Sequence, residues 1–249
     1  MTTKGQSARA LRVGWAVLSA LLVESALLAL AATPAFLLVQ WLARSTVGAA
    51  RAVVLLCAFG PAYVLFAIAL MLLSPLAMRA LGWRTPDNTA LRIQQMEWPL
   101  LDWARYLASV HLVRLVAGAV FRATPLWTMY LRLNGAQIGR GVYVNSLQVM
   151  DHNLLEFGDG VVIGADAHLS GHTVEDGLVK TGTVRLGRSV TIGVGSVIGI
   201  DVVIGAGTQV GALSLVPKHA RLAERAIYAG IPVHRVDLHR ERRLPFVPS

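Results

Sequence analysis

The chain has 249 residues, 55% of them hydrophobic, and a formal net charge of +9. Its lysines and arginines are spread through segments beside apolar stretches and through the C-terminal tail, so the charge favours an anionic membrane surface or a phosphorylated substrate over nucleic acid. The only cysteine, Cys57, lies inside an apolar stretch, which excludes intramolecular disulfides, a cysteine zinc cluster and a thiol nucleophile.

Two long apolar stretches follow the N-terminal tail of residues 1–12. Residues 13–43 carry one charge, Glu24, and residues 52–78 carry none. Each stretch exceeds the ~20 residues that cross a bilayer, and the first is too long for the apolar core of a signal peptide. A buried helical pair is disfavoured because a chain of this length could hardly cover both helices. The sequence therefore predicts two transmembrane helices within residues 13–82.

The flanking basic residues give a weak orientation signal. Three precede the first span, two lie between the spans and three follow the second: Lys4, Arg9, Arg12; Arg44, Arg51; Arg79, Arg84, Arg92. This bias predicts an integral cell-membrane protein with both ends of the helical hairpin, and the domain that follows, on the cytoplasmic face.

Residues 83–135 form a linker that is basic and partly amphipathic. Such a segment favours a helix lying in the headgroup plane, while a helix that caps the next domain is the alternative, and both can hold together. Thr124-Pro125 is expected to begin a new helix because proline suits the first helical turn, and Gly135 is expected to end it.

A six-residue repeat dominates the C-terminal half. An aliphatic residue followed by glycine recurs five times, and a small or β-branched residue stands four positions after each aliphatic one. The pairs are Leu186-Gly187, Ile192-Gly193, Ile198-Gly199, Ile204-Gly205 and Val210-Gly211, and the second positions are Val190, Ser196, Val202, Thr208 and Ser214. A period of six fits neither a helix nor an ordinary strand, and it predicts a parallel β-helix with about 18 residues in each coil, over residues 136–236.

The repeat begins at Ile138-Gly139 and slips twice. Met150 to Phe157 is one residue too long, and Leu169 to Leu186, at seventeen, is one short of three units. The slips cancel over the thirty-six residues from Met150 to Leu186, which predicts coils in register on both sides of an irregular stretch, residues 170–185. Binding groups are commonly mounted where a scaffold departs from regularity.

That irregular stretch contains His172, Glu175 and Asp176, with a lysine shortly after. A histidine can take a proton from an attacking hydroxyl or amine near neutral pH, and a carboxylate on its other nitrogen would fix its tautomer. Because no serine elbow or reactive cysteine accompanies it, direct attack on a thioester is favoured over a covalent acyl-enzyme. His152, twenty residues earlier, is predicted to lie about one coil away as a second catalytic residue.

The repeat resembles the hexapeptide-repeat (left-handed β-helix) acyltransferase superfamily. Within it, the chain is most similar to the membrane-anchored C-terminal units of nonribosomal-peptide-synthetase-like proteins such as poly-lysine synthase. The similar segments are residues 132–139 (RLNGAQIG), 157–160 (FGDG), His172 with Glu175-Asp176 and Val179-Lys180, 213–216 (LSLV) and 230–232 (GIP). They span roughly residues 124–236.

This resemblance implies a left-handed parallel β-helix, a homotrimer, and an acyl-CoA or phosphopantetheinyl-carrier thioester lying in a groove between subunits, with His172 as the catalytic base. Two features depart from the pattern: Pro217 replaces a methionine expected before Lys218, and no adenylation or carrier domain accompanies the unit. The donor, a carrier protein included, would therefore arrive in trans.

The donor's pantetheine arm would run past regular coils. The positions expected to hold it are Gly195, Ser196, Ala212 and Ser214, through backbone N–H groups that also face the developing oxyanion. Lys218 and Arg235, just beyond the last coil, are expected to bind its phosphates. The residues predict no tightly bound cofactor and no metal.

The sequence as a whole predicts a membrane-anchored all-β acyltransferase: a left-handed parallel β-helix preceded by two transmembrane helices and an interfacial helical segment, and followed by a basic tail, residues 237–249. The donor would be a thioester and the acceptor a hydroxyl or amine of a small or lipid-linked molecule, with membrane lipids as partners. A non-catalytic scaffold at the membrane is the first alternative. A zinc hydratase similar to γ-class carbonic anhydrases is the second, because His168 stands near His152 and His172, although its spacing of four from His172 differs from their five.

Overall fold

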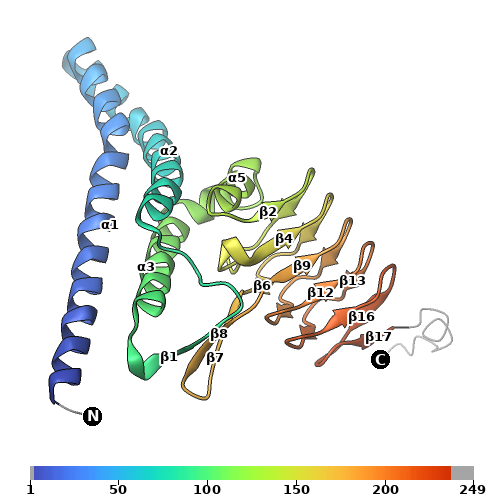
Figure 1. Cartoon of the computed structure of the whole chain (residues 1–249). Coiled ribbons are helices and arrows are strands. Elements are labelled where there is room, and N and C mark those ends of the chain that lie inside the picture. The colour runs from blue at the N-terminus through green and yellow to red at the C-terminus, as the bar shows by residue number, and fades with distance from the viewer. Residues whose placement is uncertain (1–2, 237–249) are drawn as a thin grey trace, which may run out of the picture. The chain divides into compact units, whose positions relative to one another are not determined.

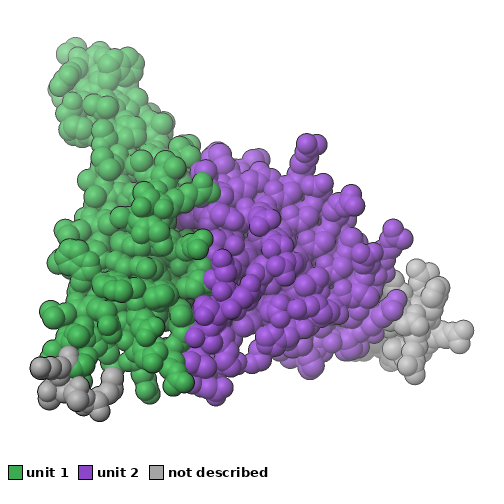
Figure 2. Space-filling view, viewed as in Figure 1, with its two compact units in different colours: residues 1–86, 91–121 green, residues 87–90, 122–249 purple. Residues whose placement is uncertain are grey.

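The computed structural model describes residues 3–236, so the predicted basic tail lies outside the described residues. The described chain forms two compact units, one of residues 3–86 and 91–121 and the other of residues 87–90 and 122–236 (Figures 1 and 2). The first is helical and the second holds the repeat.

The helical unit begins with two long helices that lie side by side, α1 (Thr3–Ser45) and α2 (Gly48–Leu81) (Figure 1). Gly82 ends α2 with φ 71°, a left-handed conformation in which its N–H reaches the carbonyls of Arg79 and Met78. Both helices are long and apolar enough to cross a membrane, as the sequence predicted.

A third apolar helical run follows a short 3₁₀ turn, Ile93–Gln95. It consists of α3 (Trp98–Val113), a π-helical segment (Arg114–Gly118) and α4 (Ala119–Phe121). By length and composition this run, Trp98–Phe121, could also cross a membrane. The interfacial position expected for it stays a prediction.

The second unit opens with α5 (Pro125–Leu133), where the Thr124 side chain accepts a hydrogen bond from the N–H of Trp127. The helix thus starts at Thr124-Pro125 and ends just before Gly135, as expected. Short strands follow: β2 (Gln137–Ile138), β3 (Tyr143–Val144), β4 (Leu155–Phe157), β5 (Val162–Ile163), β6 (His168–Leu169), β7 (His172–Glu175), β8 (Leu178–Thr181), β9 (Val184–Leu186), β10 (Thr191–Ile192), β11 (Val197–Ile198), β12 (Val203–Ile204), β13 (Gln209–Val210), β14 (Leu215–Val216), β15 (Arg221–Leu222), β16 (Ile227–Ala229) and β17 (His234–Arg235).

These strands wind into a parallel β-helix with three walls. The sheets have the strand orders β15-β12-β9-β4-β2, β16-β13-β10-β5-β3 and β14-β11-β6, and β17 adds antiparallel to β16. Regular coils pair residues 18 apart, such as Ile192 with Val210 and Ile198 with Val216. The six-residue period therefore predicted the architecture correctly.

The core of the β-helix is built from the two residue sets that the repeat predicted. The aliphatic members of the glycine pairs from Leu186 to Val210 are at most 3% exposed, and the five second positions from Val190 to Ser214 are at most 2% exposed. Burial of each large aliphatic side chain contributes about 1.5–3 kcal/mol, so stacked coils stabilise one another.

The structure corrects the predicted register of the irregular coils. Val149, rather than Met150, bridges Leu169, and Phe157 pairs with Leu186 across 29 residues. Leu169 and Leu186 therefore lie on successive walls of the same coil, one repeat unit apart and not the nearly three units that the sequence spacing indicated. The extra residues form an antiparallel hairpin, β7–β8, which leaves the coil after Gly171 and returns at Gly182. The spacing of aliphatic residues alone does not show whether the residues between Leu169 and Leu186 continue around the coil or leave it as a hairpin.

Residues 87–90 precede α3 in the chain but belong to the β-helical unit. The Thr181 N–H donates to the Thr89 carbonyl at 2.8 Å, and the Thr89 N–H donates to the Thr181 hydroxyl at 3.0 Å. The Asn153 side chain also reaches Asp87, at 3.4 Å. The chain therefore leaves this unit after residue 90 and re-enters it at residue 122.

Candidate functional site: a histidine–aspartate pair at the base of the hairpin

The hairpin starts at a corner where the backbone approaches the previous coil closely. A Cβ at Gly171 would lie 2.9 Å from the Asp151 Cβ and 2.8 Å from a Leu154 methyl carbon. Only glycine fits there, so Gly171 allows the base of β7 to pack against Asp151.

Asp151 is the buried anchor of the site. Its backbone is left-handed, with φ 54°, and it begins the 3₁₀ turn His152–Leu154 that accounts for the first slip of the repeat. The side chain has no exposed surface, and its Oδ2 accepts hydrogen bonds at 3.0 Å from the Gly171 N–H and at 3.0 Å from the Ser170 hydroxyl. These donors stabilise a buried carboxylate.

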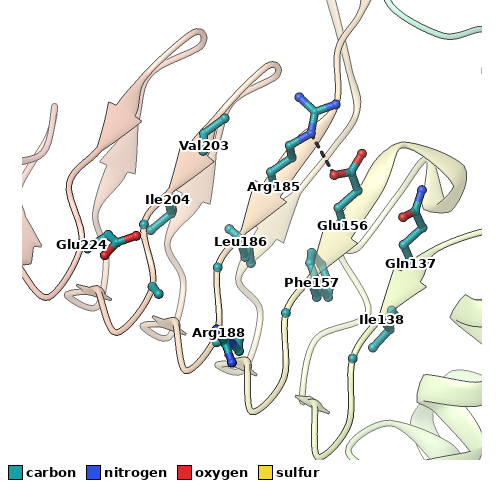
Figure 3. Close-up of a pocket in the computed structure, with 15 residues that line it drawn as sticks. Gln137, Ile138, Glu156, Phe157, Arg185, Leu186, Arg188, Val203, Ile204 and Glu224 are labelled. Carbon is teal, nitrogen blue, oxygen red and sulfur yellow. Dashed lines mark hydrogen bonds and ion pairs between the residues drawn. The ribbon is translucent and has the colours of Figure 1, made fainter.

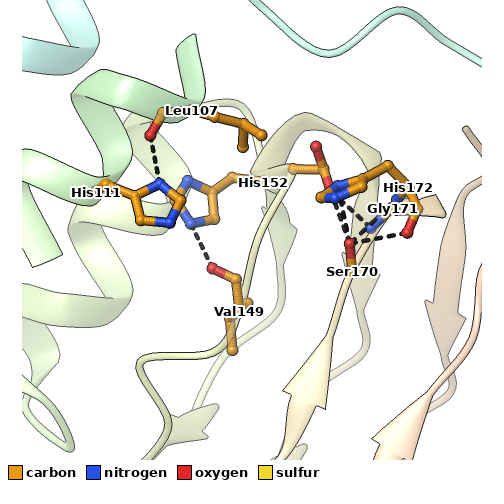
Figure 4. Close-up of polar contacts among 8 residues, drawn as sticks. Leu107, His111, Val149, His152, Ser170, Gly171 and His172 are labelled. Atoms are coloured by element: carbon orange, nitrogen blue, oxygen red, sulfur yellow. Dashed lines mark hydrogen bonds and ion pairs between the residues drawn. The ribbon is translucent and has the colours of Figure 1, made fainter. Parts of the chain in front are cut away.

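His172 completes the arrangement (Figure 4). Its Nδ1 lies 2.5 Å from the Asp151 Oδ2 and 3.0 Å from the Ser170 hydroxyl, and its side chain is 21% exposed. The neutral imidazole is therefore assigned with its proton on Nδ1, so that Nε2 carries the lone pair. Such a pair can accept a proton at Nε2 while the carboxylate stabilises the resulting imidazolium.

The carboxylates that the sequence selected lie elsewhere on the hairpin. Glu175 binds Lys180 at 2.7 Å and Lys218 at 2.6 Å, and these two ammonium groups lower the pKa of Glu175 to about 2. Asp176 is highly exposed at the tip, 4.0 Å from Lys180. The partner that orients His172 is instead Asp151, which comes from the preceding coil.

His152 is placed in the interior. It has no exposed surface, its Nε2 lies 3.0 Å from the Val149 carbonyl oxygen (Figure 4), and its ring packs edge-on against Tyr130. Burial lowers the pKa of His152 to about 4, so the ring is neutral near pH 7. Its position suits packing beneath Asp151 better than contact with a substrate.

The expected donor-binding residues are spread along the coils and are not brought together with His172. The Ser196 hydroxyl is buried and donates to the Gly211 carbonyl at 2.8 Å, and the Ser214 hydroxyl reaches the Ala212 carbonyl at 3.3 Å. Gly195 occupies a turn with φ 65°, and Arg235 is exposed on β17. Lys218 is the one of this set that reaches the hairpin, through Glu175.

A second histidine–aspartate pair occurs further along the β-helix. The His219 Nδ1 lies 2.9 Å from Asp201, which also binds Arg221 at 2.9 Å. Here the side chains of His219 and Asp201 are 61% and 34% exposed. No group of three histidine, cysteine or acidic side chains within residues 3–236 is arranged to hold a metal ion, so these residues give the zinc alternative no support.

A shallow trough runs across the wall formed by β2, β4, β9 and β12 (Figure 3). Glycines follow these strands because a Cβ at Gly158 or Gly187 would lie 2.7 Å from the backbone of the next coil. Glu156 and Arg185 form an ion pair of 2.8 Å beside it. The trough is lined by Arg185 and Leu186 of β9 and by the two residues after them, whereas the hairpin with His172 ends before β9 begins.

Sequence reasoning did not select Asp151 and Ser170. The first slip of the repeat marked the region of Asp151, and Ser170 stands at the start of the irregular stretch. Both signals identify where the chain departs from the coil. They do not show which carboxylate the departure places beside His172.

The fold and the site together describe a β-helical domain with a buried histidine–aspartate contact, carried by a chain with long apolar helices. No family model matches the chain. Over 111 residues, 45% of the chain, it is 26% identical to delta-poly-L-ornithine synthetase of Acinetobacter baumannii (strain AB307-0294). The match spans 8% of that protein's length.

The chain is also similar to solved acetyltransferase structures. A hexapeptide-repeat acetyltransferase of Vibrio cholerae O1 biovar eltor, complexed with acetyl coenzyme A, is 23% identical, with a TM-score of 0.38 over 41% of this chain and 60% of that one. Soybean serine acetyltransferase is 19% identical, with a TM-score of 0.34 over 70% of this chain and 57% of that one. The serine acetyltransferase of Brucella abortus strain S19 is 15% identical, with a TM-score of 0.37 over 70% and 56%.

Proposed function

We propose that this protein is a membrane-anchored acyltransferase that uses an acyl-CoA donor and His172 as general base. The observation that carries the proposal is the contact between the His172 Nδ1 and the buried Asp151 carboxylate. The ring is 21% exposed, and Nε2 is the nitrogen that would take a proton from an acceptor hydroxyl or amine.

The reaction needs no enzyme-bound acyl intermediate. As Nε2 removes the acceptor's proton, the acceptor oxygen or nitrogen attacks the thioester carbonyl and forms the new C–O or C–N bond. The tetrahedral intermediate then expels the thiolate by breaking the C–S bond, and the imidazolium returns its proton to sulfur. Asp151 stabilises the imidazolium between these steps.

The test compares two histidines of the full chain in detergent. His172→Gln should lower thiol release from acetyl-CoA about 10²–10⁴-fold, in the presence of an extract of cellular lipids and metabolites, because a general base contributes that much. His219→Gln, which removes the exposed paired histidine, should leave the rate unchanged. Full activity of His172→Gln would refute the assignment of the base, and absence of acetyl-CoA binding to the wild type would favour the scaffold.

The hydrogen bonds of residues 87–90 support a two-span arrangement of the membrane segments. These residues and residues 122–236 flank the run Trp98–Phe121 and fold into one unit, so both ends of the run belong on the same side of a bilayer. A helix that begins and ends on one side does not cross. We propose that α1 and α2 cross the membrane while Trp98–Phe121, which packs along both helices, does not.

Labelling of single cysteines in intact cells tests this arrangement, in a Cys57→Ser background. Cysteines introduced at Asn88 and Ser189 should react from the same side, and one at Thr46, between α1 and α2, from the opposite side. Reaction of the Asn88 and Ser189 positions from opposite sides would show that the run Trp98–Phe121 crosses the bilayer.

Self-association of the β-helix is part of the proposal. Outward-facing apolar side chains lie on neighbouring coils, including Tyr143, Val162, Val194 and Leu213, which are 37–71% exposed. A homotrimer would cover such surfaces, and light scattering in detergent should give about three times the 26.7 kDa mass of one chain. A monomer at all concentrations would contradict it.

A further inference from the structure

Within the helical unit, a crevice of about 240 Å³ lies between α1 and α3. Its walls are apolar apart from Arg105, and they run from Val13 to Leu21 on α1 and from Leu101 to Ala108 on α3. Val17 and Leu21 are 55% and 62% exposed, so the crevice opens onto the apolar surface that the helices present to lipid.

Arg105 is the polar group in the crevice, and it is 8% exposed. Its guanidinium bonds Ser19 of α1 at 2.9 Å and Asp102, and it lies over the Trp83 ring at 4.4 Å. Its Nε is buried without a hydrogen-bond partner. An unpaired buried N–H is costly, so a polar group of a molecule that enters the crevice would be stabilised at Arg105.

Two further arginines, Arg9 and Arg12, stand on α1 just before Val13, the first residue that lines the crevice. Arg9 and Arg12 donate to the carbonyls of Gln94 and Gln95, at 2.9 and 3.2 Å, and the Nε of Arg12 is also buried without a partner. Neither forms an ion pair with a carboxylate among the described residues. This end of the crevice therefore carries positive charge without a bound counterion from the protein.

We infer that the crevice binds one anionic phospholipid of the bilayer. The phosphate would lie at Arg9 and Arg12, and one acyl chain would follow the wall from Val13 to Leu21, which extends about 12 Å along α1. The small side chains of Ala16, Ala20, Ala104 and Ala108 make room for the chain. Two basic groups at an anionic headgroup and an apolar path beside them are the recognition elements for such a lipid.

The test measures lipid retained by the full chain after purification in mild detergent from vesicles of phosphatidylglycerol and phosphatidylcholine. We expect about one phosphatidylglycerol per chain, and Arg9→Gln/Arg12→Gln should lower its retention at least about fivefold. The matched control is Arg44→Gln/Arg51→Gln, which removes two arginines from the other end of α1 and from α2 and should leave retention unchanged. An equal loss in both double variants would overturn the site.

The apolar path has its own test. Ala104→Trp should fill the crevice and displace the lipid, whereas Ala26→Trp, at an exposed position of α1 outside the crevice, should not. If circular dichroism shows that the tryptophan variant fails to fold, Ala20→Leu replaces it, because this smaller change also narrows the crevice. Retention unaffected by either filling variant, or equal retention of phosphatidylcholine, would refute the proposal, and displacement by inorganic phosphate alone would show that only the anion is bound.

Discussion

Two histidine–aspartate pairs on the β-helix share the same residue types and the same kind of contact but differ in burial. Asp151 and Asp201 both adopt left-handed backbone, with φ 54° and 52°, and each contacts an Nδ1 of a histidine. The Asp151 side chain is fully buried and accepts two further donors from Ser170 and Gly171, while Asp201 is partly exposed and shared with Arg221. The difference coincides with the inserted hairpin, which begins beside the Gly171 N–H that donates to Asp151.

The largest expected effect follows from changing the two aspartates alike. Asp151→Asn should lower kcat for thiol release about 10²–10³-fold with little change in KM for acetyl-CoA, because an amide neither fixes the Nδ1–H tautomer nor stabilises the imidazolium. Asp201→Asn should change kcat less than about twofold, since solvent screens an exposed pair. Steady-state kinetics of both variants measures this, and equal losses would remove the distinction between the pairs.

Ser170 sharpens the comparison, because the exposed pair has no counterpart to it. Ser170→Ala removes the hydroxyl that lies 3.0 Å from both Asp151 and His172, and we expect kcat to fall about tenfold, equivalent to one hydrogen bond to a charged group. Ser170→Thr, which keeps the hydroxyl, should recover much of the loss. If the alanine and threonine variants are equally impaired, the effect comes from packing at the corner and not from the hydroxyl.

The architecture around these pairs could be predicted from sequence, because a period of six with glycine after each aliphatic residue has few structural solutions. The sequence also selected His172, since it stands where the period fails. Its partner was not. Glu175 and Asp176 are its neighbours in sequence, but the antiparallel pairing of β7 with β8 carries them toward the tip, while Gly171 brings Asp151 close from the preceding coil. The contact between Asp151 and His172 depends on where the hairpin leaves the coil, and the spacing of the aliphatic residues does not reveal this.

The hairpin should depend on Glu175, the carboxylate that joins it to Lys218 of a later coil. The two lysines hold the pKa of Glu175 at about 2, below its usual 4.5, so its ion pairs stabilise the hairpin above about pH 4.5 and lose this effect as the pH falls toward 2. Glu175→Gln should therefore increase hydrogen exchange of the β7–β8 amides at pH 7 and reduce kcat a few-fold. NMR can follow this exchange across pH. The difference from wild type should vanish near pH 2, because wild-type Glu175 loses its charge there. A difference that persists there would show that charge is not the cause.

The exposed pair of His219 and Asp201 should contribute least to the stability of the β-helix. His219, and next Arg221, lower the pKa of Asp201 below its usual 3.8, so its contribution to stability is present above about pH 3.8 and is lost as the pH falls further. Asp201→Asn should lower stability by less than about 1 kcal/mol at pH 7, and the difference should shrink in high salt because exposed ion pairs are screened. Thermal unfolding of the detergent-solubilised chain, at low and high salt, measures both effects. A large loss that is insensitive to salt would mean that Asp201 supports the coil as Asp151 does, and that burial alone does not separate the two pairs.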